Sequence, residues 1–173
     1  MAKQQFSLKP IARSSIPRAL QKAERYRLLN EAREAESICR DILATDPENQ
    51  EAAVCLILAL SDRFPSTQTE ADEARSLAAA LRSEHDRAYY AGVIEERWAK
   101  AMLRLHDCMS AAYASLREAM TLFEKAESLA SDDNDDATLR WNTCVRLLEK
   151  ADYTPPADES EHVEIIDEDM PMR

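Results

Sequence analysis

Glycine is almost missing from this chain, because Gly92 is the only glycine among its 173 residues. Strand-rich folds need frequent turns, and glycine is one of the residues that most often supplies them. A glycine-poor chain whose middle is dominated by Ala, Leu, Glu, Arg and Lys is typical of long helices joined by polar turns. The sequence therefore predicts an all-α fold, and its length fits one domain with tails.

Apolar residues recur at helical spacing in seven segments. We expect these helices to run from Ser15 to Asn30, Glu31 to Thr45, Glu48 to Asp62, Thr69 to Arg87, Ala88 to Leu105, Met109 to Ala130 and Asp136 to Ala151. Ser15 and Thr69 are the expected N-caps of the first and fourth helices. Short connections predict an antiparallel stack of helix hairpins, which is an α-solenoid of about seven helices.

The two ends of the chain lack a helical period and carry opposite charge. Residues 1–14 are expected to be a flexible basic segment, residues 15–151 the helical domain, and residues 152–173 a disordered acidic tail. That tail holds eight acids and one base. Its β-prone run 163–166 is similar to a SUMO-interacting motif and could add a strand to a partner's sheet. The alternative is a tail that only keeps the chain in solution.

Several classes of function are disfavoured by composition. A net charge of -11 argues against binding nucleic acid. Without an apolar run long enough for a membrane span or a leader, we expect a cytoplasmic protein. Four widely spaced cysteines, without a CxxC pair, are expected to be reduced core thiols. A weak metal-binding alternative combines His85, His106 and Cys108. No pattern supports catalysis, so no enzyme, cofactor or metal is predicted.

The stretch from Pro17 to Leu60 resembles a tetratricopeptide repeat (TPR), a helix-turn-helix unit of about 34 residues. The residues that carry the resemblance are Ala23, Tyr26, Ala35, Cys39, Ile42 and the pair Asp46-Pro47, followed by Leu56, Ile57 and Leu60 in a second repeat. Ala74, Ala78 and Leu81 continue that second repeat after a lengthened turn. In a third pair, Gly92 matches a small first-helix residue, but Ala119, Phe123 and Ala126 lie about fifteen residues too far downstream.

The resemblance implies a groove lined by the first helix of each pair. Mapped onto this chain, the partner-binding positions are Leu20, Glu24, Arg27, Val54, Leu58, Tyr89, Glu96 and Arg97. TPR proteins that hold a chaperone's C-terminal carboxylate use Lys and Asn at groove positions that here read Leu20, Glu24 and Cys55. That particular ligand is therefore disfavoured.

Three hypotheses of function follow from the sequence. The first is a protein–protein interaction module, an adaptor or scaffold that holds a peptide or helix in a TPR-like groove. The second is a small acidic TPR-type chaperone for one secreted or assembling client. The third is a structural subunit of a larger complex, with homo-oligomers as one form of assembly.

Overall fold

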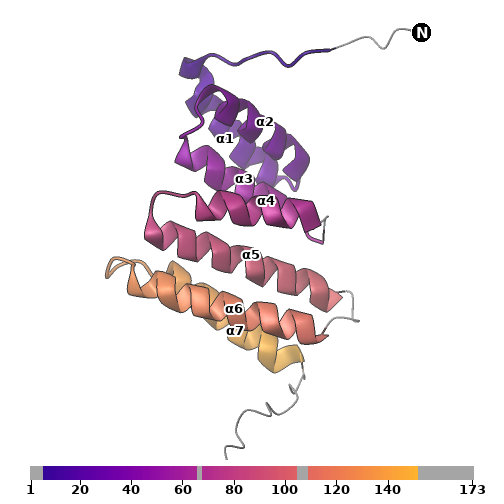
Figure 1. Cartoon of the computed structure of the whole chain (residues 1–173), viewed down its shortest axis with the longest axis vertical. Helices are drawn as coiled ribbons and strands as arrows, with labels where there is room; N and C mark the ends of the chain where they lie inside the picture. Colours follow the sequence, from indigo (N-terminus) through magenta and orange to yellow (C-terminus); the bar gives the residue numbers. More distant parts are fainter. Residues whose placement is uncertain (1–5, 66–67, 105–108, 152–173) are drawn as a thin grey trace, which may run out of the picture.

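A computed structural model describes residues 6–65, 68–104 and 109–151, and all the regular structure in these ranges is helical (Figure 1). A 3-10 turn, η1, spans Arg13–Ser15. The α-helices that follow are α1 (Ile16–Leu28), α2 (Ala32–Thr45), α3 (Gln50–Asp62), α4 (Gln68–Ala79), α5 (Glu84–Arg104), α6 (Met109–Ser128) and α7 (Asp136–Ala151). The predicted all-α fold of seven helices is confirmed.

Successive helices pack against one another in antiparallel fashion, from α1 and α2 at one end of the stack to α6 and α7 at the other (Figure 1). The odd-numbered helices also contact each other directly: α3 packs on α1 and α5, and α5 packs on α7. These four helices form one layer. On the other side, Arg40 of α2 makes a bidentate ion pair with Glu73 of α4, at 2.8 and 2.9 Å.

The boundary between α4 and α5 differs from the prediction. The fourth helix ends at Ala79 instead of Arg87, and the fifth begins at Glu84. The reason is a local cap, since Ser83 Oγ accepts a hydrogen bond from the N–H of Asp86 at 3.2 Å. Glu84 and Asp86 also place negative charge in the first turn of α5, where the helix dipole favours it.

The two predicted N-caps are not made. Ser15 has helical backbone angles as the last residue of η1, and its hydroxyl makes no capping hydrogen bond to α1. Thr69 lies inside the first turn of α4, which begins at Gln68. A cap that the sequence reading missed is at Asn49, where Oδ1 accepts a hydrogen bond from the N–H of Ala52 at 2.9 Å and starts α3.

The apolar stripes pack into two adjoining clusters. One joins α1 to α4 with the inner face of α5, and its fully buried side chains include Cys39, Ile42, Leu56, Ile57, Leu60 and Ile94. The other joins α5, α6 and α7 around Phe123, Leu116 and Cys144. Cys39, Cys55 and Cys144 are buried and free, as predicted, and Cys108 lies outside the described residues.

Gly92 allows α5 and α6 to approach closely. A Cβ atom placed on Gly92 would lie 2.7 Å from Cε1 of the buried Phe123 ring. Real carbon contacts are about 3.5–4.0 Å, so only glycine fits there without a shift of the ring. The single glycine of the chain is therefore a packing residue between two helices.

Part of the segment before α1 is fixed to the helical stack. Ile11 packs partly buried against the first cluster, and its carbonyl accepts a hydrogen bond from the hydroxyl of Thr45 at 3.4 Å. Arg13 pairs with Asp46 at 2.8 Å. The predicted acidic tail, 152–173, lies outside the described residues. None of the helices in the described ranges has the length and apolar character that crossing a membrane requires.

Candidate interaction groove

The odd-numbered helices enclose a hollow of about 270 Å³ where α1, α3 and α5 meet, which we call the central hollow. Its lining residues come from all three helices: Glu24, Arg27, Gln50, Glu51, Val54, Cys55, Leu58, Asp86 and Tyr90. Four of these nine are among the groove positions that the sequence analysis mapped, namely Glu24, Arg27, Val54 and Leu58. The structure thus brings together residues from separate helices that the sequence analysis had mapped only through the TPR resemblance.

The apolar part of the central hollow is formed by half-buried side chains. Val54 and Leu58 are one helical turn apart on α3, and Tyr90 faces the same space from α5. Burial raises the pKa of Tyr90, with a further contribution from Asp86. Its hydroxyl therefore stays protonated near neutral pH and can donate a hydrogen bond to a ligand.

The charged part of the hollow is predominantly acidic. Glu24, Glu51 and Asp86 line it together with one cation, Arg27. Asp86 contacts the ring of His85 at 3.0 Å. Within the described residues, Glu24 and Glu51 are exposed and their carboxylates have neither a hydrogen bond nor an ion pair. Two carboxylates are therefore available to a ligand.

The one cation among the described lining residues, Arg27, is already bound within the protein. Arg27 Nε lies 2.9 Å from Oδ2 of Asp62, and the other oxygen of the same carboxylate lies 2.8 Å from Arg97. Arg97 also donates to the Leu58 carbonyl at 3.0 Å and to the Ser61 hydroxyl at 2.6 Å. Asp62 therefore links α1, α3 and α5 and fixes the geometry of the hollow. Burial lowers the pKa of Arg97, and Asp62 opposes that effect.

Two cysteine thiols meet beside the hollow. Cys55 of α3 lines it, and the buried Cys39 of α2 shares a hydrogen bond with Cys55. That hydrogen bond lowers the pKa of Cys55 against the opposing effect of burial, whereas the hydrogen bond and burial together raise the pKa of Cys39. The shared hydrogen bond therefore makes Cys55 the more acidic thiol of the pair.

The remaining mapped positions lie outside the central hollow. Glu96 is 0% exposed and pairs with Lys100 and, at 3.1 Å, with Arg140 of α7. Burial pulls the pKa of Arg140 down, but Glu96 and the Tyr89 hydroxyl hold it above its ordinary value. Tyr89 and Glu96 line a second hollow between α5 and α7, of about 400 Å³. Leu20 is packed in the first core cluster. Leu20 and Glu96 therefore offer no open side-chain surface to a partner.

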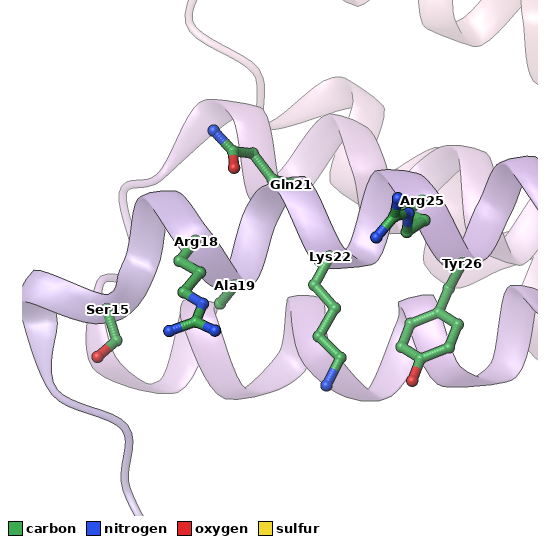
Figure 2. Close-up of a pocket in the computed structure, with 7 residues that line it drawn as sticks. All are labelled: Ser15, Arg18, Ala19, Gln21, Lys22, Arg25 and Tyr26. Atoms are coloured by element: carbon green, nitrogen blue, oxygen red, sulfur yellow. The ribbon is translucent and has the colours of Figure 1, made fainter.

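Another hollow, of about 820 Å³, has a different character (Figure 2). Its described lining residues belong to α1 except Ser15, the last residue of η1, and Arg18, Lys22 and Tyr26 project to the same side of α1 (Figure 2). The Lys22 ammonium lies 5.7 Å from the centre of the Tyr26 ring. This surface is basic and is formed by α1 and the turn that precedes it, so we regard the smaller central hollow, built by three helices, as the better candidate groove.

Sequence reasoning missed four of the residues that line the central hollow: Gln50, Glu51, Asp86 and Tyr90. It noted Cys55 as a groove position of the TPR resemblance but did not count it among the partner-binding residues. Gln50 and Glu51 begin α3 next to the Asn49 cap, so recognising that cap would have placed them at the start of the groove helix. Asp86 was assigned to the end of the fourth helix, although it lies in the first turn of α5. Tyr90 was given no role in the groove. Two of the three residues of the metal hypothesis, His106 and Cys108, lie outside the described residues. In the part of the chain that the structure describes, no group of three or more His, Cys, Asp and Glu residues could hold a metal ion.

Comparisons of the chain with models of known protein families, with characterised proteins and with solved structures found no match.

Proposed function

We propose that this protein is a protein–protein interaction module that holds a peptide or helix of a partner in the central hollow, in the manner of a TPR-like adaptor. The observation that carries the proposal is the convergence of α1, α3 and α5 on one hollow with both apolar and charged lining. Small-molecule sites enclose about 300–1,000 Å³. A hollow of about 270 Å³ suits one or two side chains of a bound segment.

The rigidity of the surrounding helices supports a binding role. Asp62 ties α1 to α5 through Arg27 and Arg97, and the Arg97 guanidinium is anchored on α3 through the Leu58 carbonyl. A site held in place before binding loses less conformational entropy when its partner docks. The hollow therefore has the organisation that recognition of a short segment requires.

The proposal is tested by affinity selection from a phage library of random twelve-residue peptides on the immobilised full chain. Selection is repeated on a variant that carries Val54→Thr and Leu58→Gln, two changes that make the apolar lining polar while nearly keeping its volume. We expect the wild type to enrich a family of related peptides and the variant to lose it. A synthetic copy of the most enriched peptide then provides a Kd by fluorescence anisotropy.

The matched control is Leu28→Gln, because Leu28 is 88% exposed at the end of α1 and is not among the described residues that line the central hollow. It should bind the peptide as the wild type does. Circular dichroism melts show whether the groove variant is still folded. Enrichment that is equal for the wild type and a folded groove variant, or no enrichment at all, would contradict the proposal.

A further inference from the structure

The central hollow combines an apolar lining with unpaired negative charge, and this combination restricts the partner. We infer that the hollow selects a segment in which a bulky apolar side chain is adjacent to a lysine or arginine. The inference rests on the proposed function and adds to it the chemical class of the bound segment.

The apolar half of the inference comes from Val54, Leu58 and Tyr90. These side chains are only half-buried in the free protein although they face a hollow of about 270 Å³. Apolar area that remains in contact with water gains free energy when another apolar group covers it. An aliphatic or aromatic side chain of the partner can supply that cover, and the Tyr90 hydroxyl can donate to its backbone.

The basic half comes from the charges around the hollow. Glu24 of α1 and Glu51 of α3 face the space from two helices, and neither carboxylate has a partner within the described residues. Asp86 adds a third carboxylate from α5. The opposing cation among the described lining residues, Arg27, pairs at 2.9 Å with Asp62, which it shares with Arg97. A cationic side chain thus meets three carboxylates, while an acidic one meets repulsion.

The same charges argue against an acidic ligand. A carboxylate entering the hollow would approach Glu24, Glu51 and Asp86, and the cation it would meet, Arg27, is already paired with Asp62. Like charges close together disfavour binding and thereby exclude wrong partners. The central hollow therefore has opposite selectivity to a groove that holds a C-terminal carboxylate.

The test uses the phage selection on the full chain, with the enriched peptides scored for lysine or arginine within two residues of an apolar side chain. The most enriched peptide is synthesised in three forms that carry lysine, glutamine or glutamate at its basic positions. Binding is measured by fluorescence anisotropy to the wild type and to a variant with Glu24→Gln and Glu51→Gln. The matched control carries Glu31→Gln and Glu34→Gln, which remove the same charge from exposed positions of the α1–α2 hairpin outside the hollow.

We expect the lysine form to bind the Glu24/Glu51 variant about 3–10-fold more weakly than the wild type, as for two partly exposed ion pairs. The control variant should keep the wild-type Kd. The glutamine form should bind more weakly than the lysine form and should not distinguish the variants. Added salt should weaken only the lysine form, because salt screens exposed pairs.

Two results would overturn the inference while leaving the proposed function intact. One is a family of peptides that depends on Leu58 and Val54 but has no excess of basic residues. The other is a lysine form that binds the wild type and the Glu24/Glu51 variant equally. If light scattering shows a dimer that the Glu24/Glu51 changes dissociate, the occupant is a second copy of this chain, and the inferred partner is wrong. A selection that enriches nothing overturns both proposals.

Discussion

The substitution Gly92→Ala tests the close approach of α5 and α6. In an open helix this change stabilises by up to about 1 kcal/mol, because alanine has the higher helix propensity. Here the new Cβ would lie 2.7 and 2.8 Å from two carbons of the Phe123 ring. The ring would have to retreat by about 1 Å to restore a normal contact. Phe123 is 0% exposed, and the centre of its ring lies 6.0 Å from the centre of the Tyr89 ring. The Phe123 ring therefore has little space into which it could move.

Overpacking of this kind costs about 1–3 kcal/mol in a well-packed core. Subtracting the gain in propensity leaves a net loss of about 1 kcal/mol for Gly92→Ala, with a range of about 0–2. The assay is urea unfolding followed by circular dichroism, with the midpoint and slope fitted together. A thermal melt should show a midpoint lower by roughly 2–4 °C.

Making Gly92→Ala in a Phe123→Leu variant separates the steric clash with the ring from any general effect of alanine at this position. With Phe123→Leu in place, the aromatic carbons that meet the new Cβ are absent, so Gly92→Ala should become neutral or stabilising. The coupling free energy between the two changes should be about 1 kcal/mol or more. If Gly92→Ala raises the free energy of unfolding in the wild-type background by about 0.5–1 kcal/mol, as in an unobstructed helix, the reasoning about close approach is refuted.

Three further perturbations follow from the polar network and the thiols. Asp62→Asn should lower the free energy of unfolding by about 1–2 kcal/mol, because two arginines lose their shared carboxylate. Replacing Lys100 and Arg140 together by alanine should cost about 3–5 kcal/mol, since Glu96 is left buried without a cation, and it should cost more than Glu96→Gln. Burial raises the pKa of Cys144 to about 12, so iodoacetamide at about pH 8 should leave this thiol unmodified until urea unfolds the chain.

Each of these predictions has a control and a contradicting outcome. For Asp62→Asn, the control is Glu31→Gln, which removes one exposed charge from the α1–α2 turn and should leave the urea midpoint unchanged. If Asp62→Asn and Glu31→Gln lower the free energy of unfolding by similar amounts, the change in net charge is responsible and the ion pairs are not. For the buried carboxylate, a double alanine variant as stable as Glu96→Gln would show that the cations are dispensable. For the thiol, peptide mass spectrometry that finds modified Cys144 in the folded chain at early times would contradict its burial.

Local features of the sequence determined the helical fold. The scarcity of glycine and the spacing of apolar residues predicted seven helices. Most predicted helix boundaries agree with the structure, because the helical period of apolar residues and helix breakers such as Asp46-Pro47 act over only a few residues. The boundary at residues 80–87 was wrong because a single serine cap outweighed a continuing apolar pattern. The resemblance to a TPR also implied that Glu24, Arg27, Val54 and Leu58 share one groove, and these four residues line the central hollow.

Only the tertiary structure decided which charges are open to a partner. Arg27 and Glu96 are both charged groove positions in the sequence, yet Arg27 is paired with a residue 35 positions away and Glu96 with one 44 positions away. Whether a charge is available depends on distances between helices, which no local pattern contains. The role of Gly92 also depends on the tertiary structure. The sequence shows that a small residue occupies position 92, but only the position of the Phe123 ring explains why a larger residue does not fit there.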